Sequence, residues 1–169
     1  MLVLGIDPGI AITGYALVGE DEGEPYLVDS GVVRTTVASV LGARLQAIYA
    51  GVTEMARRYQ PNAAAVEEVF FSRNVRSALA VGQARGVVLL ALVDAGVPVV
   101  EYKPTEIKET ITGYGAADKK QMQEMVRLLL RLDQVLQPDD AADAAAIAVC
   151  HLQHYRFNQA LAAARGQAS

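Results

Sequence analysis

Cysteine and long apolar runs are both scarce in this 169-residue chain. Its single cysteine, Cys150, cannot form an internal disulfide, and the two histidines, His151 and His154, lack the second ligand pair of a zinc site. The longest apolar run, VVLLALV at 87–93, is far shorter than the ~20 residues of a helix that spans a bilayer. The first residues, MLVLGIDPG, lack the basic region of a secretory signal. We therefore expect a protein of the reducing cytoplasm that does not enter a membrane.

Basic residues are in the minority, at 15 against 19 acids, so the formal charge is −4. Domains that bind nucleic acid are usually basic, and the net charge taken by itself argues against DNA or RNA as a partner. The rest of the composition, with 52% hydrophobic and 20% charged residues, is that of an ordinary folded domain. The position of the acids therefore matters more than their number.

Apolar runs separated by turn residues predict three strands near the N-terminus, over 2–6, 13–19 and 26–36. Apolar positions at helical spacing predict a helix over 39–59, and two further strands, over 63–71 and 97–102, flank a helix that ends near Ala95. A short turn at 104–111 and helices over 118–132 and 139–155 complete the prediction. We expect one domain over 1–157 and a loose tail over 158–169.

The order of these elements predicts a topology. Short turns join the first three strands into an antiparallel meander, while a right-handed crossover makes the later strands parallel. We therefore expect an α/β fold of the ribonuclease H-like type. Its mixed five-stranded sheet would combine three antiparallel strands with parallel strands, flanked by helices.

Four acids stand on otherwise apolar elements. Asp7 ends the run LVLGID, Glu67 follows AAAV, and Asp140 and Asp143 lie three residues apart in DDAADAAAIAV. Each acid taken singly has a plainer interpretation, as a turn residue or a helix N-cap. Together the four carboxylates would repel one another unless cations lay among them, and oxygen ligands favour Mg²⁺ or Mn²⁺ over zinc. The pattern therefore predicts a metal centre, and setting these four acids aside leaves 15 acids against 15 bases.

Two neighbouring acids are expected to lie outside this group. Side chains alternate along a strand, so Glu68 should point away from the face of Glu67. Asp139 lies about 100° around the helix from Asp140, which favours solvent or a capping position. The alanines beside Asp140 and Asp143 should let this helix approach the strand ends closely.

Five collinear blocks cover most of the chain: GIDPGIAITGYA at 5–16, IYAGVTEM at 48–55, AVEEVFFSRNVRSALAVGQARGV at 65–87, EYKPTEIKETITGYGAADKKQMQEMV at 101–126 and DDAADAAAIAVCH at 139–151. In these blocks the sequence closely resembles the RuvC-type Holliday junction resolvases. The resemblance implies a fold similar to ribonuclease H and retroviral integrase, and a homodimeric, divalent-metal-dependent endonuclease that resolves four-way DNA junctions. It also implies the branch-migration complex RuvAB as a partner.

The resemblance places the catalytic acids on the same four positions, Asp7, Glu67, Asp140 and Asp143. Two ions, Mg²⁺ or Mn²⁺, would activate a water and stabilise the 3′-oxygen leaving group. We expect Asp7 to bridge the ions, with Glu67 on one and the last two acids around the other. Some members have His where this chain has Asp140, so the all-carboxylate version is expected here.

DNA contacts are expected around these acids. The resemblance implies roles for Phe70, which would stack on unpaired bases, and for Lys108 and Lys119 at phosphates. The plainer interpretation of either lysine is a solvated charge at a helix end. The stretch 72–93 contains no acid, so we expect a basic edge formed by its arginines: Arg73, Arg76 and Arg85.

Small residues recur every four positions on the predicted second helix, at Ala78, Gly82 and Gly86. Such a stripe allows close contact either with a partner helix or with the chain's own sheet. Two-fold symmetry would set two active sites against the two symmetric strands of a junction. With the resemblance, we expect the stripe to form a homodimer interface.

Other function classes remain open from the sequence. A resolvase-like ribonuclease acting on structured RNA and a non-catalytic junction-binding module are the main alternatives to the nuclease. An actin-like ATPase or sugar kinase also ends its first strand in a GxDxG-type turn, but it needs a second domain for which this chain has no room.

Overall fold

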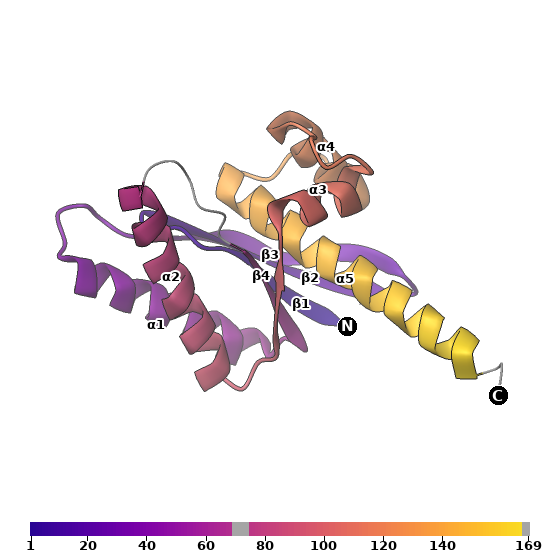
Figure 1. The fold of residues 1–169 in the computed structure, drawn as a ribbon, viewed down its shortest axis with the longest axis horizontal. Coiled ribbons are helices and arrows are strands. Elements are labelled where there is room, and N and C mark those ends of the chain that lie inside the picture. The colour runs from indigo at the N-terminus through magenta and orange to yellow at the C-terminus, as the bar shows by residue number, and fades with distance from the viewer. Residues whose placement is uncertain (69–74, 167–169) are drawn as a thin grey trace.

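The computed structural model describes residues 1–68 and 75–166, which form a five-stranded sheet with helices on both faces (Figure 1). The strands are β1 (Leu2–Asp7), β2 (Ile12–Asp21), β3 (Glu24–Arg34), β4 (Ala63–Glu67) and β5 (Val99–Tyr102). The helices are α1 (Leu41–Tyr59), α2 (Val75–Asp94), α3 (Pro104–Thr112), α4 (Lys119–Leu129) and α5 (Asp139–Gly166). Within these described ranges, no helix combines the length and the apolar character needed to cross a membrane.

The strand order is β3-β2-β1-β4-β5, which confirms the predicted mixed sheet. β2 pairs antiparallel with β1 and β3, whereas β4 runs parallel to β1 and β5. Ile6 pairs with Val66, so the next residue of each strand, Asp7 on β1 and Glu67 on β4, ends its strand beside the other. Both acids therefore lie at the carboxyl end of the parallel part of the sheet, the usual place for a ligand in α/β folds.

Alternation along β1 and β4 determines which face of the sheet each acid takes. Leu4 packs in the core formed with α1 and α2, whereas Val3 packs in the core formed with α3, α4 and α5. Val3 and Ala65 belong to the same core. Asp7 follows Val3, and Glu67 follows Ala65, by an even number of residues, so each acid shares a face of its strand with that core residue. Both acids therefore face the layer that contains α5.

Two glycines of the sheet allow α5 to lie directly on it. A Cβ atom on Gly5 would overlap the carbonyl oxygen of Ala144 and lie 2.8 Å from the amide nitrogen of Ala148. A Cβ atom on Gly14 would overlap the carbonyl oxygen of Asp140. The backbone of α5 thus rests on β1 and β2, which confirms the predicted close approach of this helix.

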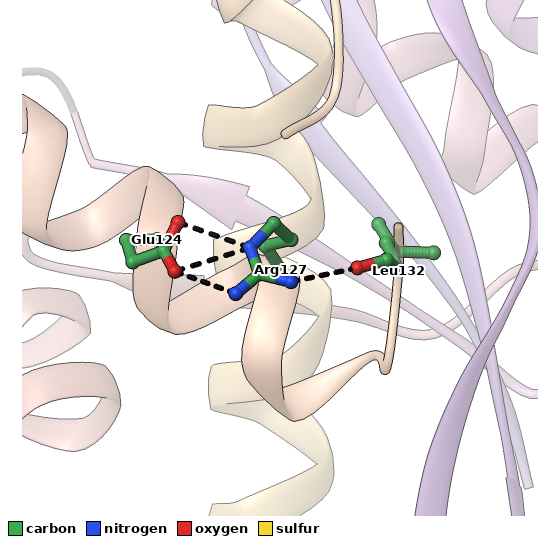
Figure 2. A network of polar contacts seen from close by, with 3 residues as sticks. All are labelled: Glu124, Arg127 and Leu132. Carbon is green, nitrogen blue, oxygen red and sulfur yellow. Dashed lines mark hydrogen bonds and ion pairs between the residues drawn. The ribbon is translucent and has the colours of Figure 1, made fainter. Parts of the chain in front are cut away.

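Arg127 fixes the connection that leads from α4 to α5. Its guanidinium group contacts both carboxylate oxygens of Glu124, at 2.6 to 3.1 Å, and donates to the carbonyl oxygen of Leu132 at 3.0 Å (Figure 2). The helix ends at Leu129, slightly before the predicted end near Leu132, because the chain turns at Arg131 with a φ of 53°.

Two C-terminal elements are longer than predicted. The turn expected at 104–111 is α3, a helix of nine residues. α5 reaches Gly166 instead of ending near Tyr155, so the tail expected to be loose over 158–169 is helical as far as Gly166. The segment QALAAAR at 159–165 is rich in alanine, the strongest helix former, which accounts for the continuation. These last turns are exposed and extend past the sheet (Figure 1).

We expect Gly5→Ala to lower the free energy of unfolding by about 1–3 kcal/mol, because the added methyl group forces α5 away from β1. Gly42→Ala is the control, since a Cβ atom there meets nothing within 4 Å and the residue lies in the exposed first turn of α1. Urea unfolding followed by far-UV circular dichroism measures both variants. Equal stability of the two would contradict the direct packing of α5 on the sheet.

Candidate metal centre

Acids from three elements meet at the carboxyl ends of β1 and β4. Asp7 and Glu67 end these strands, and the first two turns of α5 carry Asp140 and Asp143. Asp7, Glu67 and Asp143 line one pocket of about 220 Å³. The backbone of Asp140 rests on Gly14 of β2, and Gly14 is the residue that pairs with Asp7. The structure therefore brings the four predicted acids to one place.

Burial and mutual repulsion raise the pKa values of these carboxyl groups. Burial, followed by the charges of Glu67, Asp143 and Asp140, raises the pKa of Asp7 to about 7. Burial and the charge of Asp143 raise the pKa of Glu67. Burial also raises the pKa of Asp143, against the opposing effect of Lys119. Ionisation of the cluster therefore carries a free-energy cost that a bound cation would relieve.

Two lysines bring positive charge to the same pocket. Lys108 of α3 lines it and opposes the rise in the pKa of Glu67. The Nζ atom of Lys119 lies 3.1 Å from Oδ2 of Asp139 and 3.3 Å from Oδ2 of Asp143. Both lysines predicted to bind phosphate therefore lie beside acids of the cluster, and neither is an isolated surface charge.

Asp139 joins this group although the sequence predicts a solvent or capping position for it. Its side chain is 50% exposed, as expected, but it holds Lys119 together with Asp143. Asp139 and Asp143 are four residues apart and so share a helix face, and that spacing is the signal that indicates the pair. The pocket also has apolar lining residues that the sequence marks only as core: Pro104, Ile107, Met122, Ala146 and Ile147.

The donor set of the pocket fits a hard divalent cation. Its acidic lining residues offer carboxylate oxygens, and the described residues that line it include neither a thiol nor an imidazole. Across residues 1–68 and 75–166, no three His, Cys, Asp or Glu side chains form a ready-made ligand shell. The ammonium group of Lys119 supplies part of the compensating charge in this arrangement. The fit to a metal ion thus rests on donor chemistry and on the concentrated negative charge.

Three of the predicted DNA contacts belong to the segment around residues 69–77. Phe70 and Arg73 lie outside the described residues, and Arg76 lies in α2, where the structure describes its backbone but not its side chain. Arg85, farther along α2, forms an ion pair with Glu101 of β5. The basic edge predicted over 72–93 is therefore partly neutralised.

The small-residue stripe of α2 faces away from the sheet. Gly82 and Gly86 are exposed, and a Cβ atom on either would meet nothing within 4 Å, while Ala78 is half-buried. The α2 residues that enter the core lie on the opposite side of the helix: Ala84, Val88, Ala91 and Leu92. Exposed apolar side chains flank the glycines: Leu79, Leu90 and Val93. Packing on the chain's own sheet therefore does not account for the two glycines.

Known proteins match this chain closely in sequence. A family model described as "Crossover junction endodeoxyribonuclease RuvC" matches residues 3–151. The protein of that name from Chloroflexus aggregans is 56% identical over 151 residues, which cover 89% of this chain and 92% of the relative. The one from Roseiflexus sp. is 54% identical over 148 residues, with 88% of each chain covered.

Solved structures match the fold as well. The RuvC of T. thermophilus, solved in complex with a Holliday junction substrate, has a TM-score of 0.89 at 40% identity and covers 94% of this chain and 96% of its own. The yeast mitochondrial Holliday junction resolvase has a TM-score of 0.63 at 15% identity, with 92% and 83% covered, and supports the fold alone. These matches confirm the predicted ribonuclease H-like fold, and the sequence relatives show that the chain belongs to the RuvC family of crossover junction endodeoxyribonucleases.

Proposed function

We propose that this chain is a metal-dependent endodeoxyribonuclease that resolves four-way DNA junctions by paired, symmetric nicks. The observation that carries the proposal is the meeting of Asp7, Glu67, Asp140 and Asp143 at one end of the sheet in a chain of the RuvC family. Nucleases of this family depend on divalent metal ions. Two Mg²⁺ or Mn²⁺ ions held by these acids would supply an activated water and would stabilise the leaving 3′-oxygen.

The chain's own residues contribute binding and charge at this site. Asp7 ends β1 beside Glu67 of β4, and the charges of Asp140 and Asp143 also act on it, so it would be the central ligand in our proposal. Glu67, Asp140 and Asp143 would complete the ligand set. Lys108 and Lys119 border the pocket and attract the phosphates of the scissile strand. The products are a 5′-phosphate and a 3′-hydroxyl, with no covalent link to the protein.

The same family membership supports the partners that we propose. The T. thermophilus relative was solved with a Holliday junction substrate, and this chain is proposed to bind the same class of DNA. Phe70, Arg73 and Arg76 remain proposed DNA contacts. The enzyme is proposed to act in the cytoplasm together with the branch-migration complex RuvAB.

The exposed stripe of α2 supports a homodimer. Glycines with open space above them allow a second helix to come close, and Leu79 and Leu90 are 62% and 53% exposed beside them. We propose that Ala78, Gly82 and Gly86 form the centre of this interface. A two-fold dimer presents two identical pockets, as paired nicking of symmetric strands requires.

Asp7→Asn is expected to lower the rate of junction cleavage in Mg²⁺ by at least about 10³-fold, because it removes the charge of the central ligand. Junction affinity should stay equal or increase, since one negative charge near the phosphates is lost. Single-turnover cleavage of a synthetic four-way junction and a mobility-shift titration measure the two quantities. Asp133→Asn, an exposed change of the same type, is the control and should cleave normally. Substantial nicking by Asp7→Asn would be incompatible with the proposed metal centre.

Lys108→Ala and Lys119→Ala are each expected to weaken junction binding and to reduce the slope of log affinity against log salt by roughly one unit per lost phosphate contact. Arg165→Ala removes the same charge near the C-terminal end of α5, about 33 Å along the helix from Asp143, and should leave the slope unchanged. Affinity measured between low and moderate salt checks the prediction. If a lysine variant has the same slope as the unmodified chain, that lysine does not contact a DNA phosphate.

Gly86→Glu is expected to raise the dissociation constant of the homodimer at least tenfold, or about 1.4 kcal/mol, because it puts a charge into a close apolar contact. The fold should survive, since a Cβ atom at Gly86 meets nothing within 4 Å in the described part of the chain. Sedimentation equilibrium measures the constant, and Gln46→Glu on the exposed side of α1 is the control. If the Gly86→Glu and Gln46→Glu dimers have equal dissociation constants, the interface does not include Gly86.

A further inference from the structure

The turn of residues 8–11, which follows Asp7 directly, is held by hydrogen bonds from residues outside it. Thr13 Oγ1 donates to the carbonyl oxygen of Gly9 at 2.8 Å. Thr35 Oγ1 donates to the carbonyl oxygen of Ile10 at 2.5 Å, and the amide nitrogen of Thr35 donates to the carbonyl oxygen of Ala11 at 3.0 Å. Every carbonyl oxygen from Gly9 to Ala11 thus accepts a hydrogen bond that ties the turn to β2 or to the end of β3.

Arg44, in the first turn of α1, joins the same network. Its Nη2 atom donates to the carbonyl oxygen of Ile10 at 3.1 Å, and its Nε atom donates to Thr35 Oγ1 at 2.9 Å. The carbonyl oxygen of Ile10 therefore accepts two bonds, one from each side chain. Arg44 and Thr35 also bond to each other, so the three groups form a closed triangle.

The shape of the arginine side chain suits this position. A guanidinium group presents its donors in a planar fork, so one residue can reach two fixed acceptors at once. The two acceptors belong to different segments, the turn after β1 and the residue that follows β3. Arg44 is half-buried, so its two bonds are partly shielded from competing water. A lysine at this position would offer a single point charge.

The network lies at the end of the sheet that carries the acids. The turn connects Asp7 to β2, and Gly14 of β2 pairs with Asp7 and supports Asp140 of α5. No hydrogen bond or ion pair joins the described side chains of Arg44 and Asp7. The hydrogen bonds of Arg44 therefore connect it to Asp7 through the backbone of the turn.

We infer that Arg44 is a positioning residue for Asp7, which fixes the turn of residues 8–11 so that the Asp7 carboxylate remains directed at the acids of β4 and α5. The inference rests on the proposed metal centre and adds a device that keeps its central ligand in place. Groups that orient metal ligands without touching the metal typically change metal affinity by about 10–100-fold when they are removed. Because Arg44 acts through the backbone, we expect an effect near the lower end of that range.

The test is a calorimetric titration of the full chain with Mn²⁺ in the absence of DNA. Arg44→Ala should raise the dissociation constant for Mn²⁺ roughly tenfold, and Arg44→Lys should restore it only in part. Arg57→Ala, which removes the same charge from the exposed last turn of α1, should leave the constant unchanged. Junction affinity measured in EDTA should be equal for all four proteins, because the proposed role of Arg44 does not involve DNA.

The possible results distinguish a failure of the positioning role of Arg44 from a failure of the proposed metal centre. If the unmodified chain and Asp7→Asn bind Mn²⁺ equally poorly, the metal centre itself is wrong. If the unmodified chain binds Mn²⁺ and Arg44→Ala binds it equally well, only the positioning role is overturned. Weaker junction binding with unchanged Mn²⁺ affinity would overturn it too, because Arg44 would then act on DNA.

Thr35→Val provides a second route if Arg44→Ala does not fold. This near-isosteric change removes the donor to Ile10 and the acceptor for Arg44 Nε while keeping the charge. It should also raise the dissociation constant for Mn²⁺, and combining it with Arg44→Lys should give less than the sum of the two effects. Full Mn²⁺ affinity in Thr35→Val would contradict the inference.

Discussion

The direct contact between α5 and the sheet is the constraint on which the site depends. Aspartate side chains are short, so acids on a helix and acids at strand ends meet only when the two backbones come close. Gly5 and Gly14 provide that closeness, because neither has a Cβ atom to hold the helix away. Alternation along β1 and β4 then directs Asp7 and Glu67 to the same side as α5. The meeting of these acids is therefore a consequence of how closely this one helix packs on the sheet.

This packing concentrates negative charge that the fold alone does not neutralise. The pKa of Asp7 is about 7 in the folded chain against an ordinary value of 3.8, so the folded state holds its proton more tightly than the unfolded state. The contribution of Asp7 to stability is thus present at low pH and is lost as the pH rises from about 4 to about 7. Lys119 offsets part of the charge through Asp139 and Asp143. A bound divalent cation would relieve the remaining repulsion.

Much of this could be predicted from the sequence because it depends on local pattern. Strand alternation, turn residues and the placing of four acids on apolar runs predict the sheet and the meeting of the acids. The pairing of Lys119 with Asp139 and the closed triangle at Arg44 depend on how distant segments meet. The acceptor at Ile10 is a backbone carbonyl oxygen, which every residue carries and no sequence pattern marks. The direction of Gly82 and Gly86 likewise depends on which face of α2 the sheet covers.

The basic residues show why the net charge of the chain is a poor guide to nucleic-acid binding. Several arginines have internal partners: Arg85 pairs with Glu101, Arg127 with Glu124, Arg131 with Glu24, and Arg156 with Glu20. Counting every base as surface charge therefore overstates the attraction to DNA, just as counting the four clustered acids overstates the repulsion. Lys119 also has acidic partners, Asp139 and Asp143, but it and Lys108 border the pocket itself, where a phosphate would approach. Affinity for a phosphate backbone is set by the few bases within contact distance, since salt screens charges beyond about 10 Å.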